Sequence, residues 1–192
     1  MFNHHRGLWG YTGEAPDGEP LTIQATGMGG PSAAIVLAEL IELGVRRAVR
    51  VGTCGALAPG LELGELLIAR ESICADGTSK ALGARERAQA DPALTEALLA
   101  QAPGARAGTI VSVDLFYETG SRGAGHHDAL AVEMEAATLF ALGAAQGVPV
   151  ACALVVSDTF DAAGARVRID DHDLLPAAER MGAAAIAALC DQ

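Results

Sequence analysis

The run from Val148 to Val156 constrains the fold of this chain more than any other feature of its sequence. It is almost continuously apolar, with Gly147 before it and the polar pair Ser157 and Asp158 after it. A strand that is apolar throughout is typical of a sheet buried on both faces, as in parallel sheets covered by helices. The run therefore predicts a central strand of an α/β fold.

Shorter apolar runs and helix-like segments alternate along the rest of the chain. Further strands are predicted at Thr22 to Thr26, Ala48 to Val51, Glu65 to Ala69 and Gly108 to Val113. Helices are predicted at Ala33 to Leu43, Pro92 to Ala102, Glu133 to Gln146 and Pro176 to Leu189. Loops are predicted at Gly77 to Ala90 and Glu118 to Asp128. The alternation predicts a three-layer α/β/α fold around a mixed, mostly parallel sheet, in one domain over residues 1–192.

The net charge of the chain argues against two classes of binding partner, nucleic acids and anionic membranes. The formal net charge is −11, whereas binding to nucleic acids or anionic membranes usually needs a basic patch. Neither nucleic acid nor an anionic membrane is therefore expected as a partner, and any anionic ligand must meet locally placed arginines.

The apolar runs are too short for a signal peptide or a membrane span, because charged residues, Gly or Pro interrupt each of them. This predicts a soluble, cytoplasmic protein. The four widely spaced cysteines are predicted to be buried free thiols.

Ligands of such folds bind beyond the carboxyl ends of the strands. Four segments follow predicted strands: Thr26 to Ser32, Arg50 to Gly55, Asp114 to Tyr117, and Ser157 with Asp158. The first is a glycine turn before a helix, where free N–H groups favour an anion or a polar ligand, although such turns are often purely structural.

Arg50 lies at a predicted strand tip, followed by Gly52 and Thr53. A guanidinium with nearby hydroxyl and N–H donors suits phosphate. The alternative is an arginine that forms a salt bridge at the sheet edge.

Three carboxylates, two of them outside these four segments, are candidates for a role in chemistry. Glu133 and Glu135 open a predicted helix, where capping and the helix dipole explain one of them, and the other could accept both hydroxyls of a ribose. Burial of Asp158 would raise its pKa, which suits a general acid, and a turn cap is the alternative. The pairs His4-His5 and His126-His127 lack the spacing of a zinc site, so no metal is predicted.

Together these segments resemble the purine nucleoside phosphorylase and uridine phosphorylase family, in the branch typical of bacterial hexamers. The matching stretches are Asn3 to Gly13, Thr26 to Gly29, Arg50 to Gly55, Asp114 to Tyr117, Val132 to Ala137, and Val156 to Asp158. They run in the family's order over nearly the whole chain. The resemblance implies phosphorolysis of a nucleoside to free base and ribose 1-phosphate, with phosphate as co-substrate and no metal or organic cofactor.

The resemblance also implies roles for single residues. Phosphate would be bound by Arg50 and Thr53, and by Arg6 reaching into a neighbouring subunit, so a homo-oligomer is expected, either a dimer or a trimer of dimers. The ribose would be held by Met134 and Glu135, and the base by Phe116, Val132 and Ser157. Asp158 would protonate purine N7, assisted by Arg168 or, as the less favoured alternative, Arg166.

Two departures from the family pattern bear on function. The chain starts after the usual first strand and Gly-Asp-Pro phosphate loop, which predicts either an N-terminally truncated sequence or a reduced phosphate site. Uridine-cleaving members carry a glutamine and an arginine after the Phe-Tyr pair, where this chain has Gly120 and Arg122. Ser157 with Asp158 favours a purine, because a pyrimidine offers no N7. The alternatives are a uridine phosphorylase, a hydrolytic nucleosidase and an inactive nucleoside-binding subunit.

Overall fold

The computed structural model describes residues 1–117, 128–161 and 163–190. Within them, seven strands form one sheet in the order β5-β4-β6-β7-β3-β8-β9, and β1 and β2 form a separate antiparallel hairpin. The strands are β1 (Gly10–Glu14), β2 (Pro20–Gln24), β3 (Ala48–Ala56), β4 (Leu66–Ala75), β5 (Arg87–Gln89), β6 (Arg106–Val113), β7 (Ala131–Glu133), β8 (Val150–Phe160) and β9 (Arg166–Arg168).

Strand β8 is the central strand that the apolar run predicts. It is buried from Val150 to Asp158, and it pairs in parallel with β3 and antiparallel with β4 and β9. Because β4 also pairs with β6, the strands β4, β6, β7, β3 and β8 close into a ring. Successive residues of β8 belong in turn to two separate hydrophobic cores, for example Cys152 to the first and Ala153 to the second.

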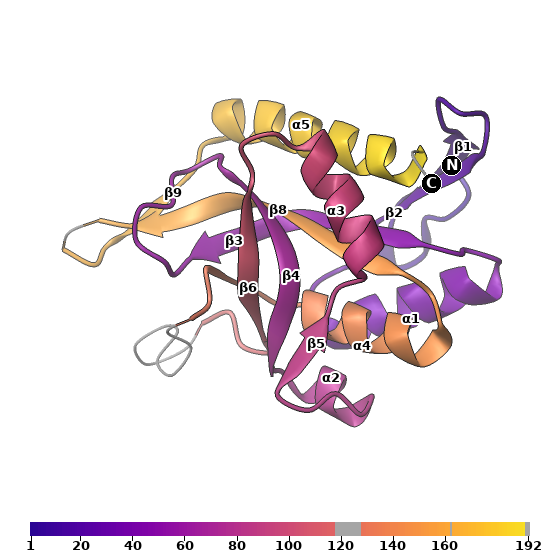
Figure 1. Cartoon of the computed structure of the whole chain (residues 1–192), viewed down its shortest axis with the longest axis horizontal. Coiled ribbons are helices and arrows are strands. Elements are labelled where there is room, and N and C mark those ends of the chain that lie inside the picture. The colour runs from indigo at the N-terminus through magenta and orange to yellow at the C-terminus, as the bar shows by residue number, and fades with distance from the viewer. Residues whose placement is uncertain (118–127, 162, 191–192) are drawn as a thin grey trace.

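Helices cover the sheet on two sides (Figure 1). Helices α1 (Gly30–Glu42) and α4 (Ala136–Gln146) pack together on one side with the short α2 (Gly77–Ala81), and α3 (Pro92–Gln101) and α5 (Asp171–Cys190) cover the other. Leu37 and Phe140 belong to the first core, and Leu98 and Met181 to the second. Each fully buried large side chain contributes roughly 1.5–3 kcal/mol of hydrophobic stabilisation.

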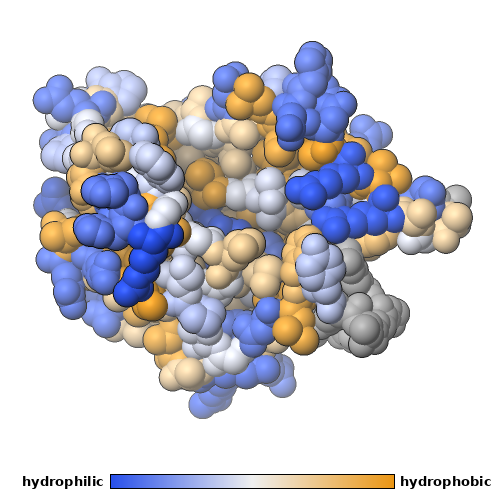
Figure 2. Space-filling model, turned by 180° about the vertical axis from the view of Figure 1, so that it is seen from behind, coloured by the Kyte–Doolittle hydropathy of each residue, from blue (hydrophilic) through white to orange (hydrophobic). Residues whose placement is uncertain are grey.

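The predicted three-layer α/β/α fold with a mixed sheet is confirmed. The long pairs β3–β8 and β4–β6 are parallel, and the shorter pairs made by β5 and β9 are antiparallel. Seen from behind, the surface mixes hydrophilic and apolar residues around a hollow (Figure 2). Among the described residues, no helix combines the length and apolar character that a membrane span requires. Of the free cysteines, Cys54, Cys74 and Cys152 are buried as predicted, and Cys190 is partly exposed.

Some predicted boundaries were wrong. The segment Gly77 to Ala90 holds α2 and β5, not a loop, because Asp76 caps α2 by accepting from the Ser79 N–H at 2.7 Å and β5 pairs with β4. The helix predicted from Glu133 begins at Ala136, because Glu133 pairs with Ser112 of β6 and ends β7. In the predicted loop Glu118 to Asp128, only Asp128 belongs to the described residues.

Candidate active site

A pocket of about 480 Å³ lies at the carboxyl ends of the strands, within the size range of small-molecule sites. All four segments singled out in the sequence contribute to it. Its lining residues are Gly27, Met28, Arg50, Gly52, Thr53, Cys54, Gly55, Ala75, Val111, Val113, Leu115, Phe116, Val132, Glu133, Met134, Glu135, Ser157, Asp158, Phe160 and Arg166. The pocket therefore combines an apolar wall with three carboxylates and two guanidinium groups.

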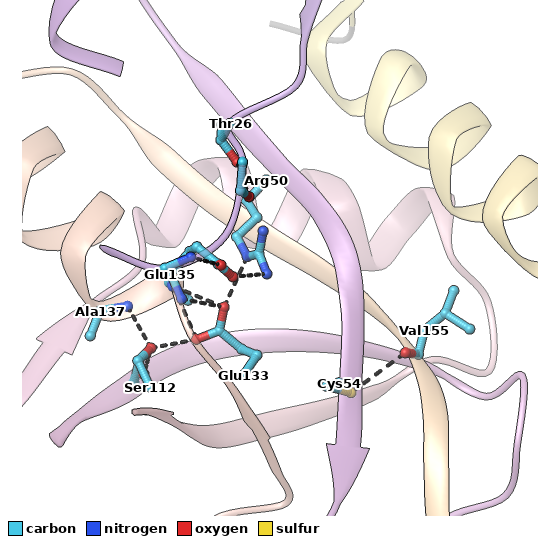
Figure 3. A network of polar contacts seen from close by, with 12 residues as sticks. Thr26, Arg50, Cys54, Ser112, Glu133, Glu135, Ala137 and Val155 are labelled. Atoms are coloured by element: carbon cyan, nitrogen blue, oxygen red, sulfur yellow. Dashed lines mark hydrogen bonds and ion pairs between the residues drawn. The ribbon is translucent and has the colours of Figure 1, made fainter. Parts of the chain in front are cut away.

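Arg50 of β3 forms ion pairs with two glutamates (Figure 3). Its Nε donates to Glu133 Oε2 at 2.9 Å, and its Nη2 donates to Glu135 Oε2. Burial alone would lower the pKa of Arg50, but the two carboxylates raise it above its usual value. The salt-bridge alternative is thus confirmed, and because the arginine also lines the pocket, its binding of phosphate stays a prediction.

Of the two glutamates, Glu133 is the one whose place is explained by capping of α4. Its carboxylate accepts from the backbone N–H of Glu135 at 2.9 Å and of Ala136 at 3.0 Å, at the start of α4. It also accepts from the Ser112 hydroxyl. The side chain is only 1% exposed, so these donors and Arg50 replace water around the carboxylate.

Glu135 connects the glycine turn to Arg50. Its Oε1 accepts from the Gly29 N–H, and its Oε2 accepts from Arg50. Burial raises the pKa of Glu135, and the neighbouring Glu133 charge adds to this, so the pKa lies above its usual value despite Arg50. Gly29 has φ 85° and ψ 156°, a conformation that is essentially restricted to glycine. The turn therefore presents an N–H to Glu135, while Gly27 and Met28 line the pocket.

Asp158 lies near the end of β8, held by two donors. Ser157 Oγ donates to Oδ2 at 2.7 Å, and Arg166 Nε donates to Oδ1 at 2.6 Å. Burial raises its pKa, but these hydrogen bonds and the charges of Arg166 and Arg168 outweigh burial and hold the pKa below its usual value. The predicted upward shift is wrong, because it was argued from burial alone, and the hydrogen bonds and arginine charges outweigh burial.

Arg166, not the favoured Arg168, makes this contact. Arg168 is the backbone partner of Asp158 in the antiparallel β8–β9 pair, and it acts on Asp158 only through its charge. Arg166 lies two positions along β9, from where its long side chain reaches the carboxylate and also lies over the Phe116 ring, with Cζ 5.0 Å from the ring centroid. Arg166 lines the pocket, and Arg168 does not.

The other predicted site residues divide into two groups. The pocket is lined by Thr53, Met134, Phe116, Val132 and Ser157. Arg6 lies outside it, exposed in a short 3₁₀ turn, η1 (His5–Gly7), with φ 56°. Gly120, Arg122, His126 and His127 lie outside the described residues.

Further pocket residues were not predicted as site residues. Val111, Val113, Leu115 and Phe160 complete the apolar wall. Val113 ends a predicted strand, and Leu115 lies in the segment Asp114 to Tyr117 that the rule of strand ends singled out, although neither was named as a site residue. The anchoring of Arg50 by Glu133 carried no signal in the sequence, because the two residues are 83 positions apart.

One cluster in the described part of the chain has the composition of a metal site. Asp170, His172 and Asp173 lie close together and exposed at the start of α5. Asp170 Oδ1 accepts from the Asp173 N–H at 2.9 Å, and His172 Nδ1 lies 3.1 Å from Asp173 Oδ1. These contacts are ordinary for a helix N-terminus, and none of the three residues lines the pocket.

The exposed His4 and His5, the histidine pair near the N-terminus, stack on each other with ring centroids 5.1 Å apart.

Comparison with known proteins identifies a matching family and several relatives. The sequence model of the Phosphorylase superfamily matches residues 1–191. The chain is 40% identical to a guanosine phosphorylase of Halorubrum lacusprofundi over 83% of this chain and 69% of that protein. It is 36% identical to a uridine phosphorylase of Thermococcus kodakarensis, over 79% of this chain and 62% of the relative.

A further relative is a purine nucleoside phosphorylase DeoD-type of Alkaliphilus metalliredigens, which is 35% identical over 85% of this chain and 74% of the relative. The aligned part of these three relatives is thus 62–74% of their length. Because the family model spans nearly the whole chain and the fold is the expected α/β/α sandwich, the chain belongs to the phosphorylase superfamily.

Proposed function

We propose that this protein catalyses the phosphorolysis of purine nucleosides to a free base and ribose 1-phosphate. The observation that carries the proposal is one pocket lined by Arg50 and Thr53, by Glu135, and by Asp158. It thus offers donors for phosphate, an acceptor for sugar hydroxyls and a carboxyl group for a purine ring. Relatives named for guanosine and for purine nucleosides support the purine assignment.

Arg50 and Thr53 bind phosphate as the co-substrate, through a charged fork and a hydroxyl. Glu135 accepts hydrogen bonds from the ribose hydroxyls, beside Met134. Phe116 and Val132 contact the base. These assignments rest on the match of the residues to the family pattern and on their common pocket.

The reaction breaks the bond between C1′ and the base nitrogen and forms a bond from C1′ to a phosphate oxygen. Positive charge develops on the ribose as the bond breaks, and the electron pair goes to the departing base. Asp158 donates a proton to N7 and so neutralises that charge, which is general acid catalysis. Because the hydrogen bond from Arg166 holds the pKa of Asp158 low, we propose that the base must weaken this ion pair before Asp158 carries the proton.

A second candidate is uridine phosphorolysis, favoured by the relative named uridine phosphorylase. In that case Asp158 would have no N7 to protonate. A homo-oligomer in which Arg6 reaches the phosphate site of a neighbour, and action in the cytoplasm, belong to the same proposal and stay predictions.

The test is an assay of inosine, adenosine, guanosine and uridine with and without inorganic phosphate. We expect base release and ribose 1-phosphate from the purine nucleosides only when phosphate is present. Equal base release without phosphate would show a hydrolase and overturn the proposal. A preference for uridine would favour the second candidate, and nucleoside binding without turnover would favour an inactive binding subunit.

A further inference from the structure

Behind Arg50, buried hydroxyl groups connect the core of the sheet to the pocket. Ser72 of β4 and Ser112 of β6 are both fully buried, and their Oγ atoms lie 2.9 Å apart. Ser112 Oγ also donates to Glu133 Oε1, at the end of β7. Hydroxyl groups in such a core are costly unless they are hydrogen-bonded, so their arrangement needs an explanation beyond packing.

The proton of Ser112 can point in only one direction. Its single O–H donates to the Glu133 carboxylate, because an ionised carboxylate only accepts. Its oxygen accepts from the Ala137 N–H at 2.9 Å. Ser72 must therefore be the donor in the bond between the two hydroxyls. The donors run in sequence from Ser72 to Ser112 to Glu133.

Arg50, which lines the pocket, donates to the same carboxylate (Figure 3). Glu133 fixes Nε and Glu135 fixes Nη2, which sets the plane of the guanidinium. The group also lies against Gly52, where an added Cβ would come within 3.0–3.1 Å of it. Among the described residues, Nε and Nη2 have carboxylate acceptors, Nη1 has none, and Arg50 lines the pocket.

We propose that Glu133 is a positioning residue that orients the Arg50 guanidinium for phosphate, and that Ser72 and Ser112 hold Glu133 in place. This inference rests on the proposed function, because it assigns phosphate to Arg50. Glu133 acts through Arg50 and does not itself contact phosphate. Its capping of α4 is a separate, structural role.

The substitution Glu133→Gln tests the proposal, because its amide can no longer accept on both sides. Either the Arg50 Nε–H or the Ser112 hydroxyl then faces a donor. We expect the phosphate KM to rise about tenfold, as for the loss of a charge-assisted hydrogen bond, while the nucleoside KM changes less than about threefold. Glu71→Gln is the matched control, because Glu71 also pairs with an arginine, Arg87, and lies outside the pocket.

A double-mutant cycle separates positioning from structure. Lysine has no planar fork, so in an Arg50→Lys background Glu133→Gln should change the phosphate KM less than about twofold. An equal factor in both backgrounds would overturn the proposal, as would an unchanged phosphate KM in Glu133→Gln. If Glu133→Gln does not fold, Ser112→Ala replaces it in the same cycle, with the same criteria.

Phosphate binding, measured without turnover, separates a failure of positioning by Glu133 from a failure of the proposed function. If the wild type has no activity, calorimetric titration with inorganic phosphate is applied to the same four proteins. The same non-additive loss of phosphate affinity would support positioning by Glu133, and equal losses in both backgrounds would overturn it. A wild type that binds no phosphate would overturn both proposals.

Discussion

At the scale of single residues, two sets of ion pairs of different kinds organise the pocket. Arg50 is shared between Glu133 and Glu135, whereas Arg166 holds Asp158 alone and also contacts an aromatic ring. The first set is nearly excluded from water, and the second is more exposed, with Arg166 27% accessible. Substitutions in the first set should therefore affect both folding and phosphate use, and those in the second mainly chemistry.

Arg50→Ala should weaken phosphate use and destabilise the fold together. It removes the proposed phosphate ligand and leaves two buried carboxylates unpaired, a type of change that costs about 3–5 kcal/mol. Phosphate-dependent kinetics and urea unfolding measure the two effects. An unchanged phosphate dependence would remove the central assignment, and Arg50→Lys, which keeps the charge, should lose less stability.

Asp158→Asn should impair purine phosphorolysis by about 10²–10⁴-fold in kcat, the usual range for loss of a general acid. The loss should be larger for adenosine than for inosine, because departure of adenine depends more on N7 protonation. Initial rates with both nucleosides at saturating phosphate check this. Equal rates for variant and wild type would exclude Asp158 as the proton donor.

Asp158 should also contribute to acid sensitivity. Its pKa is lowered in the folded state, so the ionised group stabilises the fold above the unfolded pKa of about 3.9, and this contribution disappears as the pH falls through the lower folded value. The difference in unfolding free energy between wild type and Asp158→Asn should therefore stay nearly constant down to about pH 5 and shrink as the pH falls below the unfolded pKa of about 3.9. Urea titrations across this range measure it, and a difference that grows on acidification would contradict the ion pair.

At the scale of elements, strand ends and helix starts place the site. Strands β3, β6, β7 and β8 all end at the pocket, and α4 begins there with its first N–H groups directed at Glu133. Short elements were not predicted from the sequence, because their stability comes from the neighbouring elements that they contact. Strand β7, for example, is only three residues long and pairs with both β3 and β6.

Gly29→Ala should show how strongly the turn before α1 matters. Alanine rarely adopts φ 85° and ψ 156°, so the change should cost about 1–3 kcal/mol of stability. It should also raise the nucleoside KM, because the Gly29 N–H that holds Glu135 would move. Urea unfolding and nucleoside kinetics measure this. Gly83→Ala, at a positive φ and outside the pocket lining, controls for strain alone.

At the scale of the whole molecule, the β1–β2 hairpin stands apart from the main sheet and carries exposed apolar side chains. Trp9, Tyr11 and Ile23 are 54%, 51% and 58% exposed. Arg6 lies in the adjoining turn η1 and does not line the pocket of its own chain. A second subunit would both cover the hairpin and bring Arg6 to a pocket.

We therefore expect the protein to form a homo-oligomer that involves this hairpin. Ile23→Glu should shift it toward monomer, because it places a charge where apolar contact is expected. Light scattering coupled to size exclusion measures the mass, and phosphate kinetics follow the loss of Arg6 from the neighbouring site. A fully active monomeric wild type would contradict this prediction.

The sequence by itself determined the layers and the strand ends that carry polar groups. Periodicity, glycine turns and the apolar run of β8 are local signals, and they survive in the folded chain because one core lies on each face of the sheet. The motifs around Arg50 and Asp158 are local signals too, and their order along the chain identified the family.

Only the tertiary structure decided which charges meet. Arg50 pairs with Glu133 and Glu135 across 83 and 85 positions. The β8–β9 register places Arg168 opposite Asp158, yet it is the side chain of Arg166 that reaches the carboxylate. Those contacts also reversed the predicted pKa shift of Asp158. Electrostatic effects depend on distances of a few ångströms between residues far apart in the sequence, and strand pairing sets those distances.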